Sequence, residues 1–315
     1  MIAFTWVPLL MPFLAVPAAR RAAALLAPRH AAWLLTVAAL VLAASSTAAL
    51  ALLVVPGSTY LPAVAVLGDL VRPLAEGPPA VTVALASAAT GLLLWRTAVL
   101  GAAIRRGRAE LRRARAAAGD GGAELAVLRD ELPDAYALPG RPGRIVVTTG
   151  MLRALEPAER EALFAHERAH LRGRHHVLLQ AVELAALWHP ALRALREPLG
   201  YALERTADEA AAAAVGDRRL AARAIGRAAL ATRGAPAPGA TRPRAALAAA
   251  AGPVPRRVAA LLGPARTGGA GPAPAGRLVA GALLVCLAVS GATAVGAADD
   301  LHTHIEIAQG EIPGR

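Results

Sequence analysis

The residues best suited to do chemistry are two histidines and a glutamate in the run His166-Glu167-Arg168-Ala169-His170, which has the pattern H-E-x-x-H. Side chains four positions apart stand one turn apart on the same face of a helix, so both imidazoles can bind one metal ion. Neutral imidazole is a good ligand for Zn²⁺, and Glu167 lies beside the pair, where it can polarise a bound water. The motif therefore predicts a hydrolytic zinc site with His166 and His170 as ligands and Glu167 as general base.

A catalytic zinc ion needs a third protein ligand and an open position for water, and we assign the third ligand to Glu204. Glu204 follows His170 by 34 residues, far enough for the chain to turn after Gly173 and return a second helix beside the first. Asp208 lies four residues further along the same helix face. There it is predicted to accept the free ring N–H of a ligating histidine.

Other readings of these residues stay open at this point. Asp208 is the strongest alternative to Glu204 as the third ligand. His175 and His176 are weaker alternatives, because neither shares the face of His170 well and both are expected to be solvated at a helix end. The simplest alternative to a metal site is that the motif histidines occupy a polar helix face and Glu167 pairs with an arginine.

Short elements around the motif must position it. Glu156 and Pro157 open a helical pattern that runs to about His176, with proline in the first turn and acidic residues near the positive end of the helix dipole. Residues 144–149 (RIVVTT) are β-branched and bounded by glycines, which predicts a strand, and residues 135–140 (AYALPG) are expected to pair with it as a hairpin. A substrate strand is expected to add to the edge formed by residues 144–149.

The composition points to a membrane protein. The chain has 315 residues, of which 56% are hydrophobic and 18% charged, and its mean hydropathy is +0.46, which excludes a disordered chain and disfavours a purely soluble one. Four apolar segments approach or exceed the ~20 residues of a membrane-spanning helix. They are residues 2–19, 31–55, 79 to about 95, and 278–298. A cleaved signal peptide is the alternative for the first segment, but that segment has no basic start and contains three prolines.

The arginines predict the orientation. All 34 basic residues are arginine, and residues 105–277 contain 28 of them against 16 acidic residues, whereas the loop at residues 56–78 has one arginine and two acidic residues. The positive-inside rule then places the middle segment in the cytoplasm and both termini outside. Anionic lipid headgroups account for the arginine-rich stalk at residues 105–115, so the net charge of +12 does not require direct binding of nucleic acid.

The order of these motifs resembles the BlaR/MecR-type membrane metallopeptidases. Three spans are followed by A-Y-A-L-P-G and I-V-V-T-T-G, then L-E-P-A-E-R-E-A-L-F-A-H-E-R-A-H, then W-H-P and E-R-T-A-D, then a fourth span. The resemblance covers residues 2–298. It implies a gluzincin-like domain with one Zn²⁺ per chain, bound by His166, His170 and Glu204, with Glu167 as general base and Asp208 supporting a ligand.

The resemblance also implies a fold class and a role. We expect a mainly α membrane protein with four transmembrane helices and a cytoplasmic α+β gluzincin-like zinc peptidase domain between the third and fourth. The expected substrate is a cytoplasmic protein, specifically a BlaI-type winged-helix repressor whose cleavage induces the genes it silences; a homodimer is considered as well. The antibiotic-sensing members carry an extracellular domain with an S-x-x-K serine, and a chain without lysine contains no such motif, so sensing of β-lactams by acylation is not expected.

The expected domain organisation has five parts. They are three transmembrane helices with the start of a stalk (1–104), the cytoplasmic zinc metallopeptidase domain (105–233), a Pro/Gly/Ala-rich linker with a short helix (234–277), the fourth transmembrane helix (278–298) and a short extracellular acidic tail (299–315).

Two other functions are weighed against the repressor-cleaving protease. The first is a Ste24/HtpX-like quality-control protease, in which further spans typically separate the two motifs; here residues 177–195 are interrupted by polar residues, which favours a buried cytoplasmic helix. The second is a non-enzymatic membrane sensor or adaptor that holds no metal.

Overall fold

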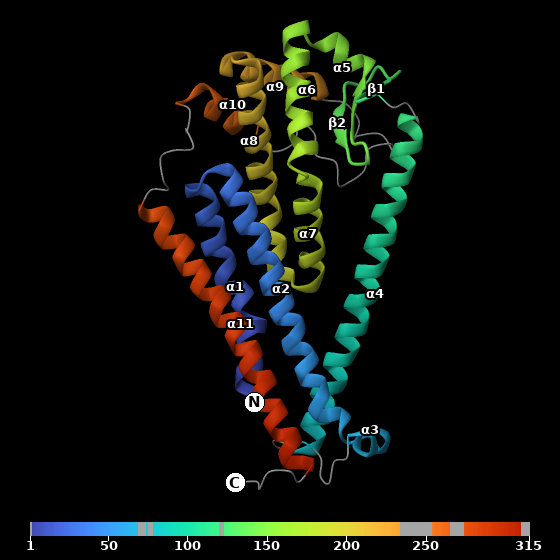
Figure 1. Ribbon diagram of the computed structural model, residues 1–315, viewed down its shortest axis with the longest axis vertical. Coiled ribbons are helices and arrows are strands. Elements are labelled where there is room, and N and C mark those ends of the chain that lie inside the picture. Colours follow the sequence, from blue (N-terminus) through green and yellow to red (C-terminus); the bar gives the residue numbers. More distant parts are fainter. Residues whose placement is uncertain are drawn as a thin grey trace.

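Long helices dominate the computed structural model, which describes residues 2–68, 74, 78–119, 123–233, 254–264 and 274–309. Four of the described helices run lengthwise through the molecule (Figure 1): α1 (Ile2–Leu25), α2 (Pro28–Ser58), α4 (Pro79–Ala118) and α11 (Pro274–Gln309). The short helix α3 (Pro62–Leu67) lies at one end. A small sheet lies at the other end with α5 (Thr149–Ala154), α6 (Pro157–Arg172), α9 (Arg218–Thr232) and α10 (Val254–Leu262).

The apolar helices indicate a membrane protein. Within the described residues, α2, α4 and α11 are long and apolar enough to cross a membrane. The first predicted span forms α1, which is not among these three. It is a continuous helix despite Pro8, Pro12 and Pro17, and it packs against α2 and α11 (Figure 1).

The helix α4 joins the third predicted span to the predicted stalk without a break. Its 40 residues extend about 60 Å, twice the ~30 Å of a bilayer core. We expected the span to end near Trp95, because an unpaired arginine inside a bilayer is costly. The structure has no helix boundary there, and the guanidinium of Arg96 donates to the carbonyl of Leu187 at the end of α7.

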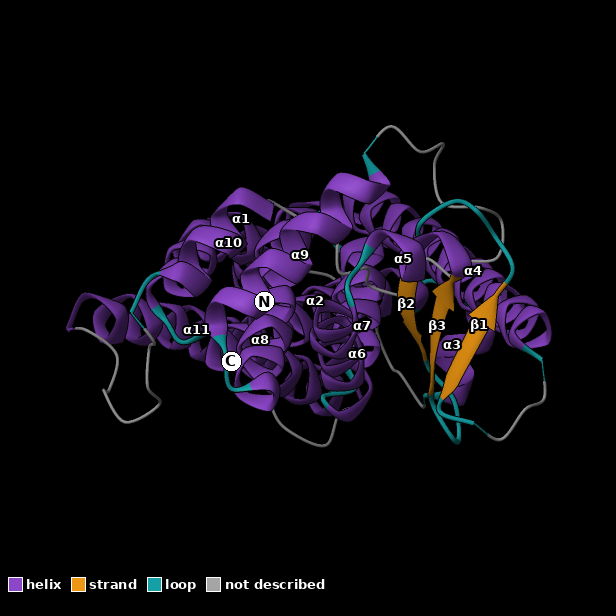
Figure 2. Ribbon diagram, turned by 90° about the horizontal axis from the view of Figure 1, so that it is seen from above, coloured by secondary structure: helices purple, strands orange, loops and turns teal. Residues whose placement is uncertain are grey.

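The sheet has three strands, β1 (Leu125–Leu128), β2 (Ala135–Leu138) and β3 (Arg144–Thr148), in the order β1-β3-β2. β2 and β3 are antiparallel, which confirms the predicted hairpin, and β1 is parallel to β3. The expectation that a substrate strand adds to residues 144–149 is wrong, because both edges of β3 are already paired. Of the two outer strands, β2 lies on the side of α6 (Figure 2).

The chain between the two motifs forms a helical hairpin that descends beside α2 and returns. Its parts are α7 (His175–Trp188), the 3₁₀ helix η1 (Pro190–Leu195) and α8 (Arg196–Val215). Two residues, Gly173 and Arg174, separate α6 from α7. The backbone of Arg174 is in the left-handed region, with φ 49°. The expected helix to about His176 is therefore two helices.

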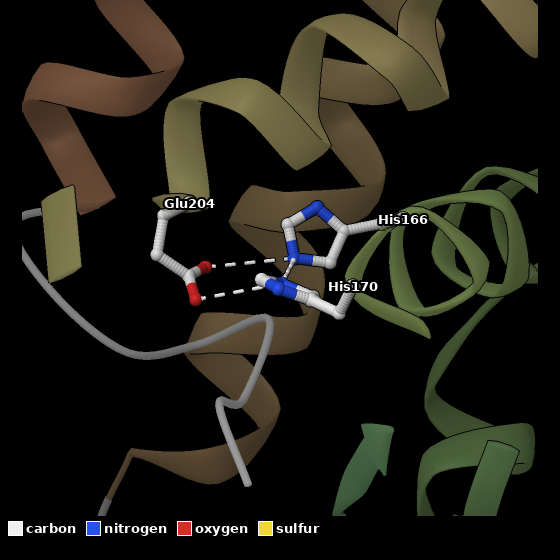
Figure 3. Close-up of side chains that lie close together, drawn as sticks. All are labelled: His166, His170 and Glu204. Atoms are coloured by element: carbon white, nitrogen blue, oxygen red, sulfur yellow. Dashed lines mark hydrogen bonds and ion pairs between the residues drawn. The ribbon is translucent and has the colours of Figure 1, made fainter. Parts of the chain in front are cut away.

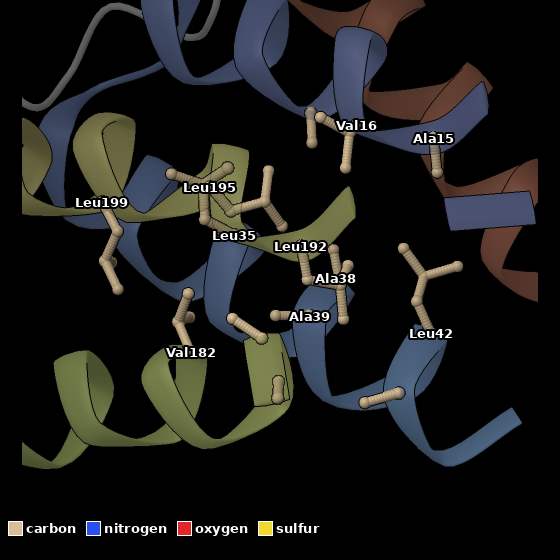
Figure 4. Packing of buried hydrophobic residues seen from close by; sticks show 14 of the residues in the cluster. Ala15, Val16, Leu35, Ala38, Ala39, Leu42, Val182, Leu192, Leu195 and Leu199 are labelled. Carbon is tan, nitrogen blue, oxygen red and sulfur yellow. The ribbon is translucent and has the colours of Figure 1, made fainter. Parts of the chain in front are cut away.

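This hairpin shares one hydrophobic core with α1, α2 and α11 (Figure 4). One face of α2, which includes Leu35 and Leu42, is covered by the hairpin. The hairpin residues in this core are fully buried: Val182 of α7, Leu192 and Leu195 of η1, and Leu199 of α8. The ring of His189 also bonds to the carbonyl of Leu9 in α1 at 3.0 Å. The expectation of a buried helix in residues 177–195 is confirmed for α7, because its apolar face packs against that of α2. The cytoplasmic position of this helix stays a prediction.

The helix α11 continues to Gln309, beyond the expected end of the fourth span at Ala298. Leu301 and Ala308 pack with Leu74, and the side-chain amide of Gln309 donates to the carbonyl of Gly68 at 2.8 Å. The first part of the predicted acidic tail is therefore an extension of α11 against the α2–α3 end of the molecule.

Candidate metal centre

Two helices bring the three predicted ligands together. His166 and His170 stand one turn apart on α6, and Glu204 faces them from α8 (Figure 3). Each offers one atom for a metal, and these three atoms lie within 4.8 Å of one another. All three side chains are buried, which distinguishes the cluster from a solvated polar helix face.

The distances between the donor atoms are close to those around a tetrahedral zinc ion, with the two imidazole nitrogens slightly nearer to each other. The two Nε2 atoms are 3.1 Å apart, and the carboxylate oxygens of Glu204 lie 3.5 Å from His166 Nε2 and 3.6 Å from His170 Nε2. Ligand atoms about 2.0–2.2 Å from a tetrahedral zinc stand about 3.3–3.6 Å apart. The donor set, two imidazoles and a carboxylate, is also one that zinc hydrolases use and leaves a fourth position for water.

Local sequence explains why α6 presents this face. Pro157 is at the first turn, and Glu156 and Glu159 form a capping box in which each side chain accepts from the other's backbone N–H. Arg227 of α9 bonds to both of these carboxylates at 2.9 Å. The start of α6 is thereby held at a fixed angle, so the histidines two to three turns later point at α8.

Asp208 supports His166 from one turn beyond Glu204. Its Oδ1 lies 3.1 Å from His166 Nδ1, the ring nitrogen that faces away from the metal position. The structure thus places Asp208 where the sequence predicts an acceptor of the free ring N–H, and places Glu204, not Asp208, opposite the two Nε2 atoms.

His175 supports His170 in a similar way, which the sequence did not suggest. Its Nδ1 lies 2.8 Å from the Nδ1 of His170, and its side chain is buried, so the expectation of a solvated histidine is wrong. Burial, together with the charge of His166, lowers the pKa of His175 to about 4. The neutral ring can accept the N–H that His170 carries at Nδ1 when Nε2 binds a metal.

Arg257 is a second residue beside the predicted ligands that we did not predict from the sequence. It lies on α10, in the segment expected to be a linker, and its side chain is fully buried. The guanidinium donates to both oxygens of Asp208 at 2.9 and 2.6 Å and lies 2.8 Å from Glu204 Oε2. A signal was present, because Val254, Val258 and Leu261 recur at helical spacing and pack against α8 and α9.

The carboxylates of the cluster favour a positive charge on His166 when no metal is bound. Burial disfavours a charged His166, but hydrogen bonds to Asp208 and Glu204 and their negative charges outweigh it and raise its pKa to about 10. Burial also opposes ionisation of Asp208, yet its hydrogen bonds with Arg257 and His166 prevail and lower its pKa. A protonated His166 therefore holds part of the charge that a bound cation would supply.

The part of the chain that contains α6 is similar to a known family of peptidases. A model of peptidase family M48 matches residues 104–192. The match includes His166, Glu167 and His170 and ends before Glu204. It supports a metalloprotease; peptidases of this family are zinc-dependent, and the donor set of His166, His170 and Glu204 is compatible with a metal site.

Curated relatives agree over short stretches. "Protease HtpX homolog 1" of Streptomyces coelicolor is 49% identical over 49 residues, 15% of this chain and 16% of that protein. "Protease HtpX homolog 2" of Methanosarcina mazei and its namesake of Methanosarcina acetivorans are each 40% identical over 53 residues, 16% of this chain and 18% of theirs. The matched part of the chain thus spans about one sixth of the length of these relatives. No solved structure matches.

Proposed function

We propose that this protein is a membrane-embedded, zinc-dependent endopeptidase that hydrolyses peptide bonds in a protein substrate. The observation that carries the proposal is the buried cluster of His166, His170 and Glu204, whose donor atoms have the separations of a tetrahedral zinc site. A metal-free adaptor would have no need for Asp208 and His175 behind the two histidine rings.

Each residue has a defined part in the reaction. A bound zinc ion would polarise the scissile carbonyl and lower the pKa of its water. Glu167, buried next to His166 on α6, takes the proton from the attacking water and delivers it to the leaving amine. Asp208 and His175 fix the orientation of the two rings, because each faces the nitrogen turned away from the metal position.

The outer edge of β2 is the proposed position for the substrate backbone. β3 is central, so only an outer strand can accept an added strand, and β2 is the one beside α6. An extended peptide paired with residues 135–138 would run along the helix that carries Glu167.

The substrate class has two candidates. The first is the BlaI-type repressor that the sequence resemblance implies. The second is a membrane or misfolded protein, as for a Ste24/HtpX-like protease, and two observations favour it: the similarity to proteins named HtpX homologues, and the α7–η1–α8 hairpin packed among the apolar helices. In both cases we propose that the catalytic end faces the cytoplasm with both chain termini outside.

Glu167→Gln is the direct test of the chemistry. The variant should insert into membranes and bind zinc as the wild type does, while proteolysis of an unfolded reporter falls by about 10²–10⁴-fold. Full activity in this variant would overturn the mechanism.

The same variant separates the two substrate candidates. Proteins that are cleaved in cells with the wild type but accumulate intact in cells with Glu167→Gln are the substrates. A DNA-binding repressor among them supports the first candidate, and membrane proteins among them support the second.

A further inference from the structure

A pocket rich in arginine opens where α2, α6, α7 and α8 meet. Its volume is about 720 Å³, and Arg29, Arg168, Arg172, Arg174 and Trp33 line part of it. Among the residues of the described chain that line it there is no aspartate or glutamate. The pocket therefore attracts an anion.

Three of these guanidinium groups are available to a ligand. Arg168 is bonded to Glu124 at 2.6 Å, but Arg29, Arg172 and Arg174 form no ion pair with any residue that the structure describes, and all three are exposed. Arginines offer several N–H groups in a planar fork that fits phosphate oxygens. A phosphate group is the anion that best uses several guanidiniums at one place.

The pocket lies at the expected level of lipid headgroups. Arg29 is in the first turn of α2. With Arg20 and Arg21 it belongs to the connection between the first two predicted spans, which contains no acidic residue and which the positive-inside rule places at the cytoplasmic surface. Trp33, one turn further along α2, is 54% exposed, as is typical of an interfacial tryptophan.

An apolar track continues from the pocket along α2. Its side chains are Trp33, Val37 and Leu40, which are spaced by four and three residues and so lie on one face of the helix. Their exposed fractions are 54%, 45% and 48%. A phosphate seated among the arginines would have its acyl chains beside this face. Inorganic phosphate would use the arginines but not the track.

The pocket adjoins the metal centre through His175, which lines it and contacts His170, but the predicted metal ligands face elsewhere. His166, Glu167, His170 and Glu204 do not line it. On α6 the lining includes Ala165, Ala169 and Arg172, spaced by four and three residues, which is a different face from that of the metal ligands.

We propose that this pocket binds the headgroup phosphate of an anionic glycerophospholipid, whose acyl chains lie along Trp33, Val37 and Leu40. The lipid bridges α2 to α6 and α8, so it links the apolar helices to the helices of the metal centre. This proposal does not depend on peptidase activity.

The test is lipid retention by the full-length protein. Wild type is purified in detergent with phosphatidylglycerol or phosphatidylcholine, and bound lipid is counted by native mass spectrometry. The pocket variant is Arg29→Gln/Arg172→Gln/Arg174→Gln. The matched control neutralises three exposed arginines of the α4 stalk, Arg105→Gln/Arg106→Gln/Arg108→Gln. Thermal melting in detergent checks that both variants are folded.

Wild type and the stalk control should each retain one phosphatidylglycerol molecule. The pocket variant should bind this lipid on the order of a hundredfold more weakly, because each of the three lost arginines weakens binding about fivefold. Phosphatidylcholine should not be retained, and glycerol phosphate, which lacks acyl chains, should not displace the lipid at equal concentration. Equal retention by the folded pocket variant would overturn the proposal. So would retention of phosphatidylcholine equal to that of phosphatidylglycerol, or displacement by glycerol phosphate, which would show a site for phosphate alone.

Discussion

Arg257 Nη1 lies 2.8 Å from Glu204 Oε2, so the third candidate metal ligand is held by an arginine from a helix that begins fifty residues later. The same guanidinium bonds to both oxygens of Asp208, which in turn faces His166. A single side chain from α10 therefore holds the carboxylates of both Glu204 and Asp208.

Removal of Arg257 should destabilise the metal centre. Arg257→Ala leaves two buried carboxylates without their partner, and the loss of one member of a buried ion pair costs about 3–5 kcal/mol. We expect a lower melting temperature and lower zinc content by elemental analysis. Arg256→Ala is the control, because Arg256 is exposed and stacks over the ring of Tyr201 at 4.8 Å. Equal effects of the two substitutions would contradict the role assigned to Arg257.

His175 should matter for zinc although it does not face the metal position. His175→Phe removes the acceptor for the Nδ1–H of His170, and loss of such partners typically weakens metal binding about 10–100-fold. Zinc affinity measured against a chelator checks this. His176→Phe, on the next and less buried residue, should change the affinity little. An unchanged affinity in His175→Phe would show that His170 is oriented by other contacts.

Zinc binding should strengthen as pH rises. The pKa of His166 is raised to about 10 in the metal-free protein, mainly by its hydrogen bonds to Asp208 and Glu204 acting against burial, so at neutral pH zinc must displace a proton from this ring. Apparent affinity should therefore increase about tenfold per pH unit between pH 6.5 and 8.5 from this proton alone. Asp208→Asn removes one cause of the raised pKa and should flatten the dependence. A wild-type affinity independent of pH would contradict a protonated His166.

Packing of the hairpin against α2 should control zinc content from a distance. Val182→Asp puts a carboxylate into the core that α7 shares with α2, where an unpaired charge is strongly unfavourable. We expect loss of bound zinc even though Val182 is not a ligand. Gln180→Asp, at an exposed position of the same helix, supplies the matched control. Full zinc content in a folded Val182→Asp variant would show that the metal centre forms without the hairpin.

The residues that could be predicted from sequence are those set by local geometry. The spacing of His166 and His170 determines their common face whatever surrounds the helix, and the same is true of Glu204 and Asp208. The hairpin of β2 and β3 follows from β-branched residues between glycines. Each of these depends on neighbours within a few turns.

The features that could not be predicted depend on contacts between distant segments. His175 is buried because α7 continues below α6 and packs on α2, a contact that its own sequence does not specify. Arg257 joins the metal centre from a helix flanked by Pro/Gly/Ala-rich sequence, and β3 loses its free edge because β1 pairs with it in parallel. Residues 234–253 of the expected linker lie outside the described part of the chain.

The hairpin between the two motifs also has a consequence for when the metal site can form. His170 precedes its descent, Glu204 lies on its return, and its tip at residues 190–195 is packed with α1 and α2. The separation of the two ligands is thus set by the packing of this hairpin on α1 and α2. The H-E-x-x-H run by itself supplies only two of the three donors, so the donor set is complete only after the long helices have packed together.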